Sequence, residues 1–315
     1  MEHRRPSGLE SDAAVQQTSD DAAVSRESAA RLGYIADPFI KHFIKHPQRR
    51  APLINRGTYC RFHGIQRVLR EFVAAALQPR VQCVVLGAGL DTSFFLLSPN
   101  LRYFEVDFAD ITAKKAQMVW RKGALRERLP EDTRVVGAEL HSETYNLIAG
   151  DLREFPSVMA RLQERGFDCE APTLFVSECV LVYLDPVCSD AILDWITTNV
   201  PRAGVVTYEQ IRPDDRFGQM MIGNLRARGL ELRGLLAYPT LESTKNRFLT
   251  RGWRVARAVD LAEYHDHCVD KRELDRLAAL ELLDEWEEFR LLAQHYAFTF
   301  AYTADSLPFS SIHFP

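Results

Sequence analysis

A glycine turn inside an apolar stretch is the first pattern in this sequence that could do chemistry. Residues 81–97 read VQCVVLGAGLDTSFFLL, an apolar run that breaks at a Gly-Ala-Gly turn and continues as a helical pattern. Gly87 and Gly89 would let the backbone approach a ligand closely, as in the first turn of a nucleotide-binding β-α unit. The dinucleotide fingerprint requires a third glycine where this sequence has Thr92. The turn therefore predicts a nucleotide-like ligand and leaves its identity open.

Polar residues follow the next three predicted strands. Asp107 ends the second strand, 20 residues beyond the first glycine of the turn, where a carboxylate can accept both hydroxyls of a ribose. Asp151 and Leu152 follow the third strand, in place to take an adenine amino group and to pack on its ring. Glu178 and Tyr183 follow the fourth. Since ligands bind beyond the carboxyl ends of the strands in open α/β sheets, these residues together favour a nucleoside ligand.

Each of these residues also has an ordinary structural explanation. The glycines could form a tight strand-to-helix turn with no ligand, and Asp107 and Asp151 could each cap a helix N-terminus. Glu178 is harder to explain in this way, because it comes directly after a buried apolar run and an acid there needs a partner. The joint pattern carries more weight than any single residue.

Charge distinguishes between the candidate nucleosides. A dinucleotide needs a helix N-terminus and glycines for its pyrophosphate, which Asp91 in the turn would repel. S-adenosylmethionine has no phosphate and carries a sulfonium and an ammonium, so acidic neighbours suit it. Methyl transfer from S-adenosylmethionine is therefore the favoured reaction.

Strands and helices alternate along the chain, which predicts an α/β fold with a doubly wound, mostly parallel sheet of the Rossmann-like class I methyltransferase type. A helical cap is expected upstream at Ser25–Leu32, Pro38–Lys45 and Arg61–Ala76. The predicted strands are Gln82–Leu86, Arg102–Val106, Asn146–Ala149, Thr173–Ser177 and Val205–Glu209. After a helix at Lys271–Leu292, His295–Ala304 should pair with Trp253–Ala258 as an antiparallel terminal pair.

Domain boundaries follow from composition. Residues 1–22 are polar and poor in large apolar side chains, so we expect a disordered tail whose removal, up to residue 21, leaves activity nearly unchanged. Residues 23–315 should form one domain. The segment of about residues 212–250 leaves strand five, where it could act as a lid on the site or be a plain structural excursion.

Composition excludes several classes of protein. The 315 residues carry a formal charge of −4, without the basic excess of a nucleic-acid binder. The six cysteines are scattered and show no zinc-ligand spacing, so no metal site is predicted. No secretory signal is visible at the N-terminus and no apolar run approaches ~18 residues, which argues against a membrane span. We expect a cytoplasmic monomer.

Several segments together resemble the leucine carboxyl methyltransferase family. The resemblance runs from about Arg26 to Thr303 and rests on INRGTYCRFHG, VVLGAGLDTSFF, YFEVDF, AGDLRE, PTLFVSECVLVYLDP and YEQIRPDDRFGQMM. It implies an S-adenosylmethionine-dependent enzyme that methylates the C-terminal leucine carboxylate of type-2A protein phosphatase catalytic subunits. These phosphatase subunits would then be the protein partner.

The resemblance also implies roles for individual residues. The residues expected to bind the cofactor are Gly87 and Gly89 in the turn, Asp107 at the ribose, Asp151 and Leu152 at the adenine, Glu178 at the methionine end, and Arg61 and Arg26. Arg61 would pair with the methionine carboxylate or the substrate carboxylate, although it could instead be a surface residue of an amphipathic helix. The family usually has Lys at the position of Arg26, which leaves the role of this residue less defined.

The implied chemistry needs no general base. A C-terminal carboxyl has a pKa near ~3.5 and is already ionised at neutral pH. Arg61, Arg26 and Tyr183 would strip water from it and aim one oxygen at the methyl group. His63 is expected to be a helix or core histidine and not a base.

Three other functions remain compatible with parts of the pattern. One is a methyltransferase of tRNA wybutosine synthesis, a relative that continues into a long repeat-rich C-terminal half which we do not expect in this chain. The second is a nicotinamide-dependent oxidoreductase, which Asp91 and Thr92 disfavour. The third is a catalytically inert phosphatase-binding module that kept the fold.

Overall fold

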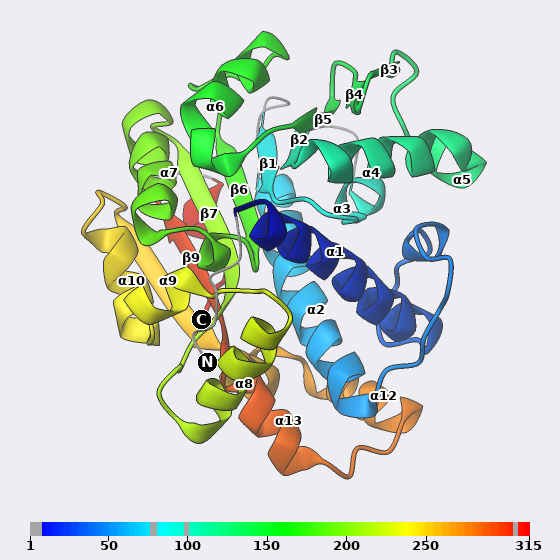
Figure 1. The fold of residues 1–315 in the computed structure, drawn as a ribbon, viewed down its shortest axis with the longest axis vertical. Helices are drawn as coiled ribbons and strands as arrows, with labels where there is room; N and C mark the ends of the chain where they lie inside the picture. The colour runs from blue at the N-terminus through cyan, green and yellow to red at the C-terminus, as the bar shows by residue number, and fades with distance from the viewer. Residues whose placement is uncertain (1–7, 76–80, 98–100, 305–307) are drawn as a thin grey trace.

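The computed structural model describes residues 8–75, 81–97, 101–304 and 308–315, and its central feature is a nine-stranded sheet (Figure 1). The strand order is β3-β4-β5-β2-β1-β6-β7-β9-β8, and the five strands from β5 to β7 are parallel. Antiparallel strands extend both edges. The strands are β1 Gln82–Leu86, β2 Arg102–Asp107, β3 Arg134–Val136, β4 Glu139–His141, β5 Tyr145–Ala149, β6 Thr173–Glu178, β7 Ala203–Gln210, β8 Val255–Asp260 and β9 Tyr296–Tyr302.

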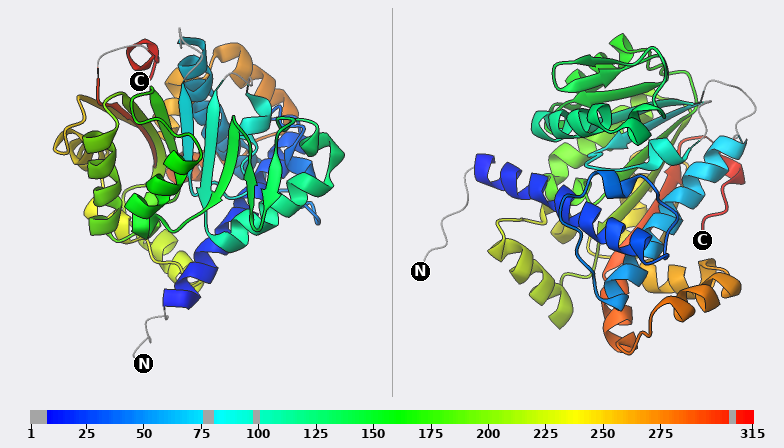
Figure 2. Two further views of the ribbon diagram at one scale, coloured as in Figure 1. Left: turned by 90° about the horizontal axis from the view of Figure 1, so that it is seen from above. Right: turned by 90° about the vertical axis from the view of Figure 1, so that its right-hand side faces the viewer.

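Helices cover both faces of the sheet (Figure 2). The α-helices are α1 Gly8–Arg31, α2 Pro52–Ala75, α3 Ser93–Leu96, α4 Ala109–Arg121, α5 Gly123–Arg126, α6 Phe155–Glu164, α7 Pro186–Asn199, α8 Arg216–Ala227, α9 Arg233–Ala237, α10 Leu241–Leu249, α11 Leu261–Cys268, α12 Lys271–Leu280 and α13 Trp286–Ala293. Short 3-10 helices are η1 Ile40–His42, η2 Leu152–Glu154, η3 Leu181–Tyr183 and η4 Phe309–Ser311. Within the described ranges no helix is long and apolar enough to cross a bilayer.

Two apolar clusters, one on each face, explain why the central strands are almost continuously apolar. In β1, Cys83 and Val85 pack with side chains of α2, while Val84 and Leu86 pack with side chains of α6 and α7. Every residue of β1 is buried. Side chains of a strand alternate between faces, so a strand covered on both sides shows no polar alternation.

The predicted sheet is confirmed. All five parallel strands are present with their bounds shifted by two residues or fewer, and β8 and β9 form the antiparallel terminal pair. The hairpin of β3 and β4 was not predicted, because three-residue strands are too short to show a period.

The N-terminal segment differs from the prediction of disorder through residue 22. Residues 8–22 belong to α1, and residues 1–7 lie outside the described residues. Three ion pairs tie residues 8–22 to distant parts of the chain: Asp12 to Arg153, Asp20 to Lys114 and Asp21 to Arg228. α1 also packs along α2, as Figure 1 shows. These partners are remote in sequence, so composition alone did not reveal the helix.

Two other predicted helices are shorter in the structure. Pro38–Lys45 contains only the 3-10 turn η1, and Lys271–Leu292 is divided into α12 and α13. The division falls at Glu281, which has an extended backbone and accepts hydrogen bonds from Arg49 at 2.6 Å and Asn55 at 2.9 Å. The predicted helix Arg61–Ala76 is part of α2, and Ala76 lies outside the described residues.

The insertion after β7 forms α8, α9 and α10, and its second half is attached firmly to α7. Asp190 of α7 binds Arg247 at 2.8 Å and also binds Arg251, and the Tyr238 hydroxyl donates to it at 2.6 Å. The first helix of the insertion, α8, packs less closely on the rest of the chain, since Gly218 is its only buried residue. The lid role of the insertion and the single-domain division stay predictions.

Candidate active site

The carboxyl ends of four neighbouring parallel strands carry the residues that the sequence placed in the site. Gly87 follows β1, Asp107 ends β2, Asp151 follows β5 and Glu178 ends β6. Hydrogen bonds join these ends: the Gly87 N–H donates to the carbonyl of Val106 at 2.9 Å. The structure thus gathers the strand-end residues along the carboxyl ends of the parallel strands, as the sequence predicted. We call this the carboxyl edge of the sheet.

The glycine turn has the backbone shape for which glycine is needed. Gly87 has φ +67° and Gly89 has φ +48°, in the left-handed region. A Cβ on Gly87 would lie 2.4 Å from Cγ2 of Val180, and one on Gly89 would lie 3.1 Å from Cβ of Ser19 in α1. The turn is therefore packed between the segment after β6 and α1, with no room for larger residues at Gly87.

Asp107 fixes the turn from the end of β2. Its Oδ2 accepts the Gly89 N–H at 2.7 Å, and its Oδ1 accepts the Phe108 N–H at 2.7 Å. Burial raises the pKa of Asp107, and these two backbone donors oppose the shift. Because an ionised carboxylate has about four acceptor positions, two donors leave capacity for a ligand.

Asp151 makes the helix-capping contacts that are the structural alternative to its predicted role in binding adenine. Its side chain caps η2 by accepting the Arg153 N–H at 2.9 Å, and it pairs with the Arg153 guanidinium at 2.6 Å. Burial would raise the pKa of Asp151, but Arg153 outweighs that effect and holds it below its ordinary value. Leu152 is buried among apolar side chains that include Phe155. The adenine role of both residues stays a prediction.

Arg26 joins α1 to the glycine turn. Its Nε lies 2.7 Å from Asp37 Oδ2, and its Nη1 lies 2.5 Å from Asp91 Oδ1. Its guanidinium also lies over the ring of Phe62, 4.7 Å from the centroid. Burial alone would raise the pKa of Asp91, but Arg26, Lys115 and the Ser93 N–H together lower it. Arg26 Nη2 is buried and has no hydrogen-bond partner among the described residues.

Arg61 of α2 and Glu178 of β6 form the second ion pair of the site, with Nε and Oε2 2.7 Å apart. The guanidinium lies 5.1 Å from the ring centroid of Tyr208 in β7. Burial opposes the charge of Arg61, yet Glu178 raises the pKa of Arg61 above its ordinary value. The side chain is 28% exposed and paired with Glu178, and its role in binding a carboxylate stays a prediction.

Tyr183 lies at the end of η3, beside this pair. Its side chain packs against a small apolar cluster that includes Val182 and Leu232. Burial raises the pKa of Tyr183, and the positive charge of Arg61 acts in the opposite direction. The structure thus places Tyr183 on the same side of the site as Arg61.

His63 lies apart from these groups. Its Nδ1 is 2.9 Å from the Tyr264 hydroxyl, and its ring stacks on Tyr59. Burial lowers the pKa of His63, as expected for a core histidine. Within the described part of the chain, no cluster of three or more His, Cys, Asp or Glu side chains could hold a metal ion.

Sequence reasoning missed four residues at this edge. Asp37 binds Arg26 from a loop, and Ser19 lies against the turn, but neither stands in a recognisable pattern. Cys179 has φ +57°, a strained conformation that the sequence does not reveal. Glu209 could have been found, because it ends the fifth predicted strand and the strand-end rule applies there as well.

The parallel sheet with its antiparallel terminal pair, the glycine turn and the acid at the end of β2 define the class: an S-adenosylmethionine-dependent methyltransferase of the class I fold. Two solved structures share this fold at low sequence identity. A Thermobifida fusca protein assigned as a methyltransferase has a TM-score of 0.51 at 13% identity, covering 83% of this chain and 92% of its own. A DUF574 family protein from Streptomyces avermitilis has a TM-score of 0.53 at 12% identity, covering 90% of this chain and 97% of its own.

The particular family follows from sequence. Residues 14–197 match the family model described as leucine carboxyl methyltransferase, and the chain belongs to that family. The leucine carboxyl methyltransferase 1 homologue of Arabidopsis thaliana is 38% identical and aligns over 92% of this chain and 89% of its own. Leucine carboxyl methyltransferase 1 of Rattus norvegicus is 37% identical and aligns over 92% of this chain and 90% of its own. Human tRNA wybutosine-synthesizing protein 4 is 35% identical over 93% of this chain but 45% of its own.

Fold and family imply the use of S-adenosylmethionine, and the residues at this edge fit such a ligand. The turn offers backbone without side chains at Gly87 and Gly89. Asp107 retains acceptor capacity for hydroxyl groups, and Arg26 Nη2 is a buried donor without a partner among the described residues. The predicted methyltransferase class is confirmed, and the oxidoreductase alternative is excluded by the family.

Proposed function

We propose that this protein transfers a methyl group from S-adenosylmethionine to the C-terminal leucine α-carboxylate of type-2A protein phosphatase catalytic subunits, as a monomer in the cytoplasm. The observation that carries the proposal is the extent of the similarity. Residues 14–197 match the leucine carboxyl methyltransferase family model, and two proteins named leucine carboxyl methyltransferase 1 or its homologue are 38% and 37% identical to the chain. A carboxylate acceptor also suits a site that carries two partly buried arginines.

In this proposal the cofactor lies against the glycine turn. The backbone at Gly87 and Gly89 contacts it, Asp107 accepts the ribose hydroxyls, and Asp151 with Leu152 meets the adenine. Glu178 faces the ammonium of the methionine end, where its negative charge is favourable. Arg61 and Arg26 supply donors for carboxylates. When bound, S-adenosylmethionine supplies an electrophilic methyl group.

The chain's task on the acceptor side is to bind and orient a carboxylate. A C-terminal carboxyl with a pKa near ~3.5 is ionised at neutral pH, so no residue has to remove a proton. Arg61, Arg26 and Tyr183 hold it out of water and direct one oxygen at the methyl carbon. That oxygen forms the new carbon–oxygen bond while the carbon–sulfur bond breaks and its electron pair stays on sulfur. Arg61 already shares its charge with Glu178, which prevents an ion pair strong enough to quench the nucleophile.

Transfer of a labelled methyl group tests the proposal directly. Purified protein, labelled S-adenosylmethionine and a purified phosphatase catalytic subunit should give label in a base-labile ester at the phosphatase C-terminus. The matched control is the same subunit without its last leucine, which should remain unlabelled. Label on internal Asp or Glu, or equal labelling of the truncated subunit, would contradict the proposal.

The similarity to human tRNA wybutosine-synthesizing protein 4 supports a second candidate, methylation of a tRNA during wybutosine synthesis. It is tested by replacing the phosphatase with tRNA in the same assay. Label in the tRNA with none in the phosphatase would establish this alternative. A calorimetric titration that shows no binding of S-adenosylmethionine would instead indicate an inert phosphatase-binding module.

A further inference from the structure

Glu209 is an acid at the same edge of the sheet to which the proposed mechanism gives no role. It lies near the carboxyl end of β7, next to Tyr208, whose ring supports Arg61. β7 pairs in parallel with β6, so that Tyr208 is in register with Glu178. Glu209 is therefore adjacent to the Arg61–Glu178 pair without belonging to it.

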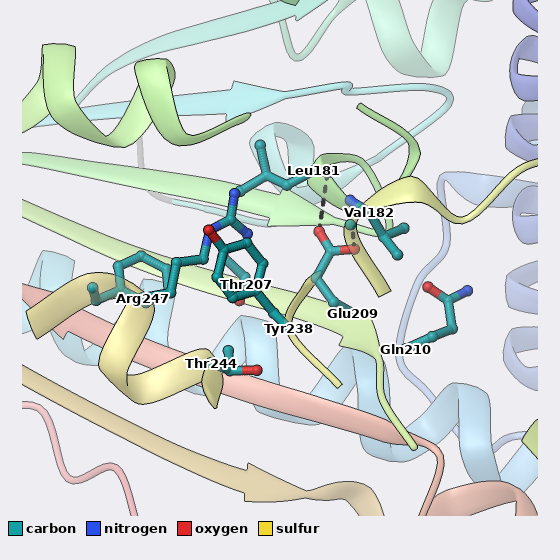
Figure 3. Close-up of a pocket in the computed structure, with 10 residues that line it drawn as sticks. Leu181, Val182, Thr207, Glu209, Gln210, Tyr238, Thr244 and Arg247 are labelled. Atoms are coloured by element: carbon teal, nitrogen blue, oxygen red, sulfur yellow. Dashed lines mark hydrogen bonds between the residues drawn. The ribbon is translucent and has the colours of Figure 1, made fainter. Parts of the chain in front are cut away.

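The carboxylate of Glu209 accepts three consecutive backbone N–H groups. Its Oε1 accepts from Val180 at 3.3 Å and from Leu181 at 3.1 Å, and its Oε2 accepts from Val182 at 3.2 Å. Figure 3 shows the carboxylate directed at Leu181 and Val182, at one side of the pocket that it lines. Donors at the start of a helix that lack an intrahelical partner are satisfied by such an anion.

The segment held in this way carries three parts of the site. Glu178 precedes it and binds Arg61, and Tyr183 ends η3. Val180 lies against the glycine turn, where it fills the space that a Cβ on Gly87 would need. Between them Cys179 adopts φ +57° and donates its N–H to the Tyr208 carbonyl at 2.7 Å. A strained residue keeps its conformation only where its surroundings impose it, and Glu209 supplies three of the restraining contacts.

Among the described residues, Glu209 has no bound cation. Arg247 of α10 faces it across the pocket, but that guanidinium is already bound to Asp190 at 2.8 Å and to the Ser189 hydroxyl at 2.6 Å. The other titratable groups facing it are Cys179 and Tyr183 on the held segment, and Tyr238 after α9 lines the same pocket. Burial raises the pKa of Glu209 to about 7, while the three N–H donors and Arg247 oppose the rise.

We propose that Glu209 is a positioning residue whose carboxylate form holds residues 178–183 in the arrangement that methyl transfer requires. The inference rests on the proposed methyltransferase function and deepens it. Glu209 acts through Glu178, Val180 and Tyr183 and touches neither substrate. When its carboxylate gains a proton, one acceptor becomes a donor and a backbone N–H loses its partner. The rate of transfer should therefore fall as the pH decreases through about 7.

The substitution Glu209→Gln isolates this role, because glutamine has the same shape but only one acceptor oxygen. In one orientation its amide NH₂ would face the N–H of Val182, and in the other it would face the N–H groups of Val180 and Leu181. In either case two donors would face each other without an acceptor. We expect kcat to fall about tenfold to a hundredfold, as for other small misplacements of reacting groups, with little change in KM. The loss of rate below about pH 7 that we expect for wild type should be absent from the variant.

Two comparisons keep a structural effect separate from positioning. Glu242→Gln in α10 removes an exposed acid from the same insertion and should leave kcat and its pH profile unchanged. For Glu209 the pKa in the folded chain is raised, so the group's own contribution to stability is present at low pH and is lost as the pH rises through about 7. Glu209→Gln should consequently keep its unfolding temperature at pH 8 within a few degrees of wild type.

A readout without catalysis completes the test. In wild type, the amide nitrogen and hydrogen chemical shifts of Val180, Leu181 and Val182 should titrate together with a midpoint of about 7, and in Glu209→Gln they should not. Amide shifts that are constant between about pH 6 and 8, or an unchanged kcat in Glu209→Gln, would overturn the inference. If wild type transfers no methyl group at all, the proposed function fails, while the amide titration still decides whether Glu209 holds this segment.

Discussion

Two acids flank the candidate site, and their charge is compensated in different ways. On the side of the glycine turn, Asp91 is paired with the Arg26 guanidinium at 2.5 Å. On the side of β6 and β7, Glu209 accepts backbone N–H groups at 3.1–3.3 Å and has no bound cation among the described residues. Both side chains are withdrawn from solvent, yet the pKa of Asp91 is lowered and that of Glu209 is raised to about 7.

The difference shows what a bound cation adds to a buried carboxylate. Dipoles of N–H groups stabilise the charged form, but for Glu209 they do not cancel the cost of burial. For Asp91, the contacting Arg26 guanidinium, together with Lys115 and the Ser93 N–H, outweighs that cost. One side of the site therefore keeps a fixed charge at neutral pH, and the other side can change its charge there.

Removing the cation nearest to the proposed acceptor should have the largest effect. Arg61→Ala leaves Glu178 partly buried without its partner and removes the fork that would orient a carboxylate. We expect methyl transfer to fall by about a hundredfold or more, on the order of 3 kcal/mol. Initial rates with a phosphatase substrate measure this loss, and circular dichroism checks that the fold is kept.

Arg61→Lys is the matched variant, because it keeps the charge and loses the planar fork. Its rate of methyl transfer should lie between those of wild type and Arg61→Ala. Normal turnover by Arg61→Ala would remove Arg61 from the mechanism and leave the acceptor carboxylate without its assigned partner.

Removing the cation on the other side should reduce stability as well as methyl transfer. Arg26→Ala leaves Asp91 and Asp37 buried without a cation, which should cost on the order of 3 kcal/mol of unfolding free energy at pH 7. The pKa of Asp91 in the folded chain is lower than its ordinary value of 3.8. The stability that the charged carboxylate contributes is therefore present above pH 3.8 and is lost as the pH falls through the lowered pKa.

Urea unfolding of wild type and Arg26→Ala at neutral and at acidic pH measures this dependence. The difference between the two proteins should be largest near neutral pH and should shrink below about pH 4. A difference that does not depend on pH would show that Arg26 stabilises by packing on Phe62 and not by charge.

Deleting residues 1–21 should have a moderate effect, in contrast to the expectation from composition. The deletion removes Ser19 from its place beside Gly89 together with the ion pairs of Asp12, Asp20 and Asp21. The glycine turn would be left more exposed to water. We expect S-adenosylmethionine to bind several-fold more weakly in calorimetry, and unchanged affinity would support the expectation made from composition.

Neutralising the three acids of α1 should have the smallest effect. The triple variant Asp12→Asn, Asp20→Asn, Asp21→Asn keeps the helix and removes its ion pairs, most of which are solvent-exposed. Such pairs contribute about 1 kcal/mol or less each and are screened by salt. Thermal unfolding at low and high salt should show a small loss that disappears at high salt. A loss as large as that of the deletion would mean that charge, not packing, holds α1 on the turn.

How much the sequence predicted depends on the range of the interaction. The five parallel strands and the Gly87–Gly89 turn were correct because they rest on local periodicity and on turn chemistry. The disorder assigned to residues 8–22 was wrong because α1 is tied down by partners more than ninety residues away, such as Lys114 for Asp20. The helix expected at Lys271–Leu292 is divided for a similar reason, since Glu281 binds Arg49 and Asn55.

The sequence by itself determined the order of the five parallel strands, the glycine turn and the acid at the end of β2, because each has a signature within a few consecutive residues. Only the tertiary structure decided which charged side chains form ion pairs with one another. Arg26 reaches Asp91 across 65 positions and Arg61 reaches Glu178 across 117. The three N–H donors of Glu209 are brought to it by the parallel pairing of β6 and β7. Burial and ion pairing depend on neighbours in space, so the charge state of each acid at this edge is a property of the folded chain.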